Sequence, residues 1–115
     1  MRERVRDKGR LEHILDAIAN VIEFTKGITY ENFLSDKILF FAIVKNIEII
    51  GEASYKLSKE FKTANNNVEW EDIIGLRHVL VHGYYHIQEE RVWKIIQKDL
   101  LPLKEQIQTL YNNET

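Results

Sequence analysis

The sequence DKILFFAIVKNIEIIGEASYKLSKEF, at residues 36–61, decides the fold class. Its apolar run at residues 38–44 has no polar side, which predicts a helix near the centre of the molecule, covered on most sides. Ser35 or Asp36 is expected to cap this helix, which could extend to about Phe61. At about 1.5 Å per residue such a helix would be close to 40 Å long. That is long for a chain of this size, and it indicates a partner that covers part of the helix.

Helical spacing continues on the N-terminal side of this segment. Apolar residues recur every three or four positions over residues 11–25, which predicts an amphipathic helix with Asp7 as its N-cap and Gly27 after its C-terminal end. Residues 29–34 predict a short turn with apolar anchors. The three Asn residues at 65–67 predict another turn.

The C-terminal half also has a helical pattern. A third helix is expected over residues 70–83, a short connection at 84–86 and a fourth helix around 92–96. Pro102 should break or restart that helix, and residues 103–110 should form a last short one. Since no strand alternation is present and the connections are short, we predict a single all-α domain over all 115 residues, an up-and-down bundle of four to five helices.

The composition places the chain among folded globular proteins. Hydrophobic residues make up 44% of the chain and charged residues 30%, a balance unlike that of disordered proteins. Because the chain has no Cys, it can have neither a disulfide framework nor a Cys nucleophile. The apolar run at residues 38–44 is too short to cross a bilayer, and the first residues lack the apolar core of a signal peptide. We therefore expect a cytoplasmic protein without a membrane partner.

The charge balance limits how the chain could bind nucleic acid. Lys and Arg total 16 and Asp and Glu total 18, a net charge of −2. A protein that binds nucleic acid over its whole surface is usually strongly basic, so an RNA contact would need a local patch. Residues 2–10 form one basic segment, and Lys56, Lys59 and Lys62 form a second series. A solvated tail and a solvated helix face are simpler explanations of the two.

Side chains that can carry chemistry gather in the segment RHVLVHGYYH at residues 77–86. His78, His82 and His86 follow one another at four-residue spacing, which could bring two imidazoles to a zinc ion. A zinc-protease helix, however, has Glu directly after its first His, whereas Val79 stands here, and the segment contains no carboxylate. Helix-end His residues that interact with the dipole are a further explanation. We therefore expect no metal and no cofactor.

The segment IGLRHVLVHGYY at residues 74–85 resembles the signature of HEPN domains, in particular their HepT-like branch. The motif of that branch, Arg-x4-His-x-Tyr, is matched by Arg77, His82 and Tyr84. Further segments agree with the branch in the same order along almost the whole chain: RLEHILDAI at 10–18, IIGEA at 49–53, VWKII at 92–96 and DLLPL at 99–103.

This resemblance implies a HEPN bundle that forms a homodimer and acts as a metal-independent endoribonuclease. HepT-like proteins resemble toxins of two-gene, type VII-like toxin–antitoxin systems, and their antitoxin is a minimal nucleotidyltransferase that attaches AMP to the motif tyrosine, here Tyr84. The resemblance makes Arg77 and His82 the catalytic residues, and His78 and Tyr84 the residues that position RNA and its phosphate. The position of His78 is often Asn in this branch. Glu52, in the Gly-Glu-Ala segment, also matches a family position, but its role is open.

The residue types suit this chemistry. In metal-free RNA cleavage the 2′-OH is the nucleophile, so the protein needs none of its own. His82 can transfer protons near neutral pH, because an unperturbed His titrates at about 6.5. Arg77 can bind the phosphate through a permanently charged fork. Residues five apart lie about 140° apart on an ideal helix, so either the helix bends before Gly83 or the two residues act with partners across a dimer axis.

Two other functions stay open at this stage. A non-catalytic HEPN module that binds a nucleotide or the transferase is favoured slightly by the modest net charge. A purely structural dimeric bundle is the third. The intact pair of Arg77 and His82 favours the enzyme.

Overall fold

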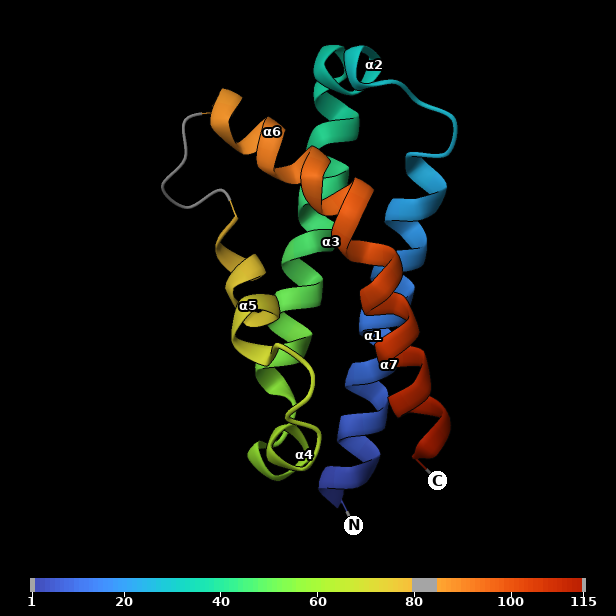
Figure 1. Ribbon diagram of the computed structural model, residues 1–115, viewed down its shortest axis with the longest axis vertical. Helices are drawn as coiled ribbons and strands as arrows, with labels where there is room; N and C mark the ends of the chain where they lie inside the picture. The colour runs from blue at the N-terminus through green and yellow to red at the C-terminus, as the bar shows by residue number, and fades with distance from the viewer. Residues whose placement is uncertain (1, 80–84, 115) are drawn as a thin grey trace.

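The computed structural model describes residues 2–79 and 85–114, and within these ranges its regular secondary structure consists of helices without strands (Figure 1). The helices run alternately up and down the long axis: α1 rises from the N-terminus, α3 descends, α5 rises, and α6 and α7 descend. The prediction of an all-helical bundle is confirmed. The elements are α1 (Arg2–Phe24), α2 (Tyr30–Ser35), α3 (Lys37–Lys56), α4 (Lys59–Ala64), α5 (Trp70–Gly75), the 3₁₀ turn η1 (Leu76–His78), α6 (Tyr85–Lys94), the π-helical turn η2 (Ile95–Asp99) and α7 (Leu100–Asn113).

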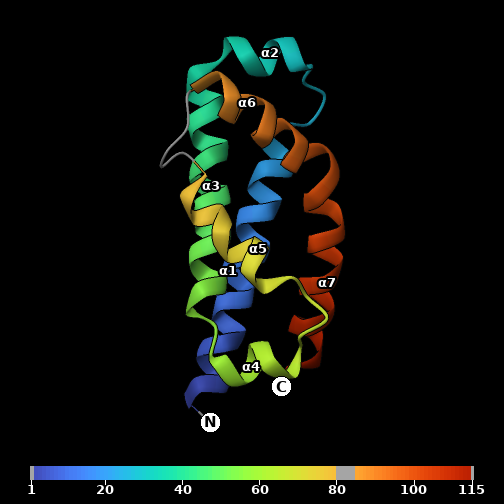
Figure 2. The same ribbon diagram turned by 60° about the vertical axis from the view of Figure 1, so that its left-hand side comes forward.

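The long helices α1 and α3 form the centre of the core, and α7 lies along α1 (Figures 1 and 2). The apolar stripe predicted over residues 11–25 faces this core. Each fully buried aliphatic or aromatic side chain contributes about 1.5–3 kcal/mol to stability, so these helices hold the bundle together. The apolar residues of these three helices that have no exposed surface are Leu11, Ile14, Ile18 and Val21 in α1, Phe40, Ile43, Ile47 and Ile50 in α3, and Ile107 in α7.

The central helix is shorter than predicted, because Leu57 and Ser58 are extended and separate α3 from α4. Asp7, the expected N-cap of the first helix, instead lies within α1 and is 4% exposed. Its carboxylate accepts hydrogen bonds from the backbone N–H of Ser58 at 2.8 Å and from the Ser58 hydroxyl at 2.7 Å. The Ser58 hydroxyl oxygen accepts in turn from the N–H of Phe61 and caps α4. A continuous helix would leave the buried Asp7 carboxylate without these donors.

The apolar run at residues 38–44 has an inner and an outer side. Phe40, Ile43 and Val44 are buried, but Ile38 is 85% exposed and Phe41 is 50% exposed. The expectation that the run is covered on most sides is therefore wrong for the single chain. In the described part of the chain, α1 covers one side of α3 and the α5–η1 segment another, and the third side is left open.

The third helix is also shorter than predicted. α5 ends at Gly75, and η1 continues it by one tighter turn to His78. The rest of the predicted helix, with its end at Gly83, falls partly outside the described residues, because residues 80–84 are not among them.

The fourth and last helices differ from the prediction at two places. Tyr85 and His86 belong to α6 rather than to a connection. Pro102 does not interrupt the helical structure, because α6, η2 and α7 follow one another directly. In the widened turn before it, the backbone N–H of Leu100 donates to the carbonyl oxygen of Ile95. A proline crowds the preceding turn and has no N–H, and a π-helical turn at that point accommodates it.

Two of the predicted helix ends, at Asp36 and at Gly27, are confirmed. Asp36 caps α3, since its Oδ1 accepts from the N–H of Leu39 at 3.0 Å. Gly27 has a φ of 74°, the left-handed conformation that follows a helix end. Residues 65–67 form the predicted turn. Residues 29–34 are helical rather than a simple turn, because the Thr29 side chain caps α2. No helix in the described ranges is long and apolar enough to span a membrane.

Candidate active site at the contact between α3 and η1

Arg77 lies on η1, which packs against α3 (Figure 2). This contact is close because Gly51 of α3 has no side chain. A Cβ atom on Gly51 would overlap the backbone nitrogen of Arg77 and would lie 3.0 Å from its Cα and Cβ atoms. Carbon atoms normally approach to only about 3.5–4.0 Å. The lack of a side chain at Gly51 therefore allows the backbone of Arg77 to contact α3 directly.

The Arg77 side chain has two neighbours that define its position. Its Nε–H donates to Nε2 of His78 at 3.1 Å. Its Cζ lies 3.9 Å from the centroid of the Tyr55 ring, a cation–π arrangement. Acceptance by Nε2 requires a neutral His78 with its proton on Nδ1. Among the residues that the structure describes, no carboxylate pairs with Arg77, so no acidic side chain of this part neutralises the guanidinium.

Positive charge gathers around Tyr55. Lys62 Nζ lies 5.9 Å from the ring centroid and donates to the carbonyl oxygens of Ser54 and Tyr55 at 3.3 and 3.1 Å. Burial lowers the pKa of Lys62 below its usual 10.5, the nearby Asp7 carboxylate opposes this shift, and the charge of Arg77 adds to it. Lys62 thus caps the end of α3 and places a second cation beside the ring.

The predicted site residues fall into two groups. Arg77 and His78 are in direct contact. His82 and Tyr84 lie outside the described residues, as does the side chain of His86, so the zinc alternative and the distance from Arg77 to His82 are not tested. In the described ranges no cluster of three or more His, Asp or Glu side chains could hold a metal ion.

Glu52 lies on the exposed side of α3. It is exposed and lines a hollow of about 190 Å³ between α1 and α3, together with Arg10, His13 and Lys56. Arg10 Nε is buried there and has no hydrogen-bond partner among the residues that the structure describes. Glu52 forms no ion pair with Arg77 in the described part of the chain.

Two residues of the site were not singled out from the sequence. Gly51 lies within the IIGEA segment, but a glycine inside a helical pattern does not reveal which backbone approaches it. Tyr55 follows Gly51 by four residues, so both lie on one face of α3. That spacing was visible. The contact between Tyr55 and Arg77, which are 22 positions apart, could not be read from the sequence.

Comparisons with known proteins identify the family of the chain. The model of the family described as Ribonuclease HepT-like matches residues 14–110. The chain belongs to the HepT-like ribonuclease family. The HepT-like match includes α3, Gly51 and Tyr55 as well as the segment with Arg77.

Individual proteins that are similar to the chain are ribonucleases by name. The chain is 38% identical over 101 residues to "Putative RNase MJ1380" of Methanocaldococcus jannaschii, covering 88% of this chain and 93% of that protein. It is 36% identical over 103 residues to "Probable ribonuclease HepT" of Thermococcus cleftensis, covering 90% and 94%. No solved structure matches this HepT-like chain.

Proposed function

We propose that this chain is a metal-independent endoribonuclease with Arg77 and His82 as its catalytic residues. The observation that carries the proposal is the Arg77 guanidinium, which is stacked on Tyr55, bonded to His78 and paired with no carboxylate of the described residues, in a member of the HepT-like ribonuclease family. A guanidinium in this state can bind a phosphate through two parallel hydrogen bonds.

The proposed reaction needs only groups of the RNA and of the protein. The 2′-OH attacks the adjacent phosphorus, its proton passes to a His82 imidazole, and the bond to the 5′-oxygen breaks. A protonated imidazole supplies a proton to the leaving 5′-oxygen, and a 2′,3′-cyclic phosphate remains on the other fragment. Arg77 stabilises the negative charge that grows on the phosphorane oxygens. His78 and Tyr84 position the RNA beside this phosphate.

We infer that the active form is a homodimer that uses the outer side of α3. Exposed side chains follow one another along this side at helical spacing: Ile38, Phe41, Lys45, Glu52 and Tyr55. The apolar end of the stripe suits an obligate interface. The other end reaches Tyr55, which contacts Arg77. A two-fold axis on this stripe would bring a second Arg77 and His82 to one cleft, and one imidazole could then act as base while the other acts as acid.

The partner proposal rests on the family resemblance. A minimal nucleotidyltransferase antitoxin would attach AMP to Tyr84, which stands two residues after His82. The phosphodiester charge of the AMP, placed beside Arg77, would occupy the position of an RNA phosphate and so inhibit the toxin. Co-expression with a neighbouring transferase gene should add AMP increments to the intact mass, and these increments should disappear in Tyr84→Phe. Increments that survive in Tyr84→Phe would contradict the assignment.

Cleavage of a single-stranded RNA in EDTA tests the enzymatic proposal. Arg77→Ala and His82→Ala should each lower the rate by about 10²–10⁴-fold. Lys104→Ala, which removes one exposed positive charge from α7, is the control and should cleave like the wild type. Full activity of both site variants, or loss of wild-type activity in EDTA, would refute the mechanism. A wild-type protein that binds AMP but cleaves no RNA would instead be the non-catalytic module.

A further inference from the structure

We propose that Tyr55 is a positioning residue for Arg77: its ring sets the plane of the guanidinium that receives the RNA phosphate. The inference rests on the proposed function for its catalytic meaning. The claim that the Tyr55 ring orients the Arg77 side chain can be tested without measuring activity.

The Arg77 backbone and side chain are fixed by different neighbours. Gly51 determines where the backbone lies. His78 accepts a single hydrogen bond from Nε, and one such bond still allows the guanidinium to turn about that axis. The ring of Tyr55, with the guanidinium carbon 3.9 Å from its centroid, favours one plane. A bidentate phosphate contact depends on that plane, because the fork of N–H groups lies in it.

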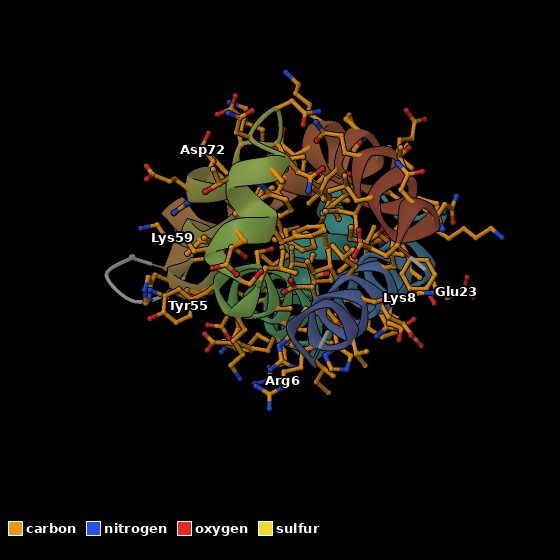
Figure 3. All side chains as sticks on the ribbon, turned by 90° about the horizontal axis from the view of Figure 1, so that it is seen from below. Arg6, Lys8, Glu23, Tyr55, Lys59 and Asp72 are labelled. Atoms are coloured by element: carbon orange, nitrogen blue, oxygen red, sulfur yellow. The ribbon has the colours of Figure 1, made fainter. Side chains whose placement is uncertain are left out.

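The Tyr55 side chain contacts Arg77 and is not part of the hydrophobic core. Its side chain is 52% exposed and does not belong to the buried core. It lies one helical turn after Gly51 on α3, so the helix that seats the Arg77 backbone also carries the ring. Lys62 fixes the carbonyl oxygen of Tyr55 at the end of that helix. Figure 3 shows Tyr55 with Lys59 on one side of the molecule, opposite Lys8.

The chain contains a matched control for the ring itself. Tyr111 in α7 also has a cation near its ring, Lys8 Nζ at 5.1 Å from the centroid. Figure 3 shows Lys8, the cation of this pair, on the opposite side of the bundle from Tyr55, and the pair does not include Arg77. Tyr111→Leu therefore removes an aromatic ring that also has a nearby cation, at a place away from the proposed site.

The rate of RNA cleavage should depend on the aromatic ring of Tyr55 and not on its hydroxyl group. In Tyr55→Leu we expect kcat to fall about 3- to 30-fold, the range of cation–π contacts from exposed to desolvated sites. KM should change by less than about twofold, because Arg77 acts mainly on charge that develops in the transition state. Tyr55→Phe and Tyr55→Trp keep an aromatic face and should retain kcat within about twofold, as should Tyr111→Leu. Wild-type kcat in Tyr55→Leu, or an equal loss in the Phe variant, would overturn the proposal.

A second measurement does not need activity. The ¹⁵N-edited NMR spectrum contains the Nε–H resonance of Arg77, which Arg77→Lys identifies. A proton held near an aromatic face is shifted by the ring, so the resonance should move to an ordinary position in Tyr55→Leu and stay in place in Tyr55→Phe and Tyr111→Leu. An unmoved resonance in Tyr55→Leu refutes the positioning role. An inactive wild type with the expected shift refutes the ribonuclease proposal and leaves the positioning role intact.

Discussion

Replacing Gly51 with Ala would put a methyl group into the contact that seats Arg77. The new Cβ would overlap the backbone nitrogen of Arg77 and would lie 3.0 Å from its Cα and Cβ. Since both sides of the contact are backbone or Cβ atoms, no flexible side-chain end can move away. To restore an ordinary carbon separation of about 3.5–4.0 Å, η1 must move away from α3 by up to about 1 Å.

The expected loss of stability follows from two opposed effects. Alanine in a helix interior is favoured over glycine by about 0.5–1 kcal/mol. Crowding of a close contact costs about 1–3 kcal/mol. Gly9 in α1 offers a control, because a Cβ there would meet no atom within 4 Å. Gly9→Ala should gain the helix effect alone, and the free energies of unfolding of the two variants should therefore differ by about 1–3 kcal/mol. Urea unfolding at one fixed protein concentration measures this difference.

Gly51→Ala should also slow catalysis, because it displaces Arg77. A displacement of about 1 Å at a catalytic group can lower a rate by about 10²-fold. We expect Gly51→Ala to remain folded, with an unchanged far-UV circular dichroism spectrum, and to cleave RNA about 10- to 100-fold more slowly. Gly9→Ala should cleave like the wild type. If Gly51→Ala is as stable as Gly9→Ala and cleaves RNA at the wild-type rate, the close seat of Arg77 on α3 is wrong.

Further predictions concern the surroundings of the site. Phe41→Glu should convert a dimer into a monomer in light scattering, since it puts a charge into the apolar end of the α3 stripe; a dimer that persists would place the interface elsewhere. His78→Asn should keep activity within about threefold because an amide oxygen can still accept from Arg77 Nε, whereas His78→Leu should not. Because burial lowers the pKa of Lys62, the folded chain releases this proton at a lower pH than the unfolded chain. The stability of the wild type relative to Lys62→Met should therefore increase as the pH rises from that lowered pKa towards 10.5. A flat difference over this range would contradict the assignment.

Features of the fold that depend on residues close together in the sequence can be predicted from the sequence. The stripe over residues 11–25, the Asp36 cap and the left-handed Gly27 follow from local spacing and local hydrogen bonds, and the structure has all three. The end of α3 at Lys56 does not follow from such rules. It depends on a hydrogen bond between Asp7 and Ser58, which are 51 positions apart.

The candidate site divides in the same way. The motif in residues 77–84 identifies Arg77 as a catalytic candidate through its resemblance to a family, without any knowledge of its surroundings. Its contacts with Gly51 and Tyr55 come from the packing of η1 on α3. Gly51 lies in a segment that resembles the family, but that resemblance does not say which backbone approaches it. Only the tertiary structure relates Gly51 and Tyr55 to Arg77.

The bond between Asp7 and Ser58 has a practical consequence for any shortened version of the protein. A chain that starts after residue 7 would retain every side chain of the candidate site. It would nevertheless lose the buried acceptor for the Ser58 N–H, at a cost of about 1–3 kcal/mol, at the corner where Lys62 fixes the end of α3. The first helical turns, which resemble a dispensable charged leader, are thus a structural brace for the corner that carries Tyr55. Removing them would loosen the site from a distance.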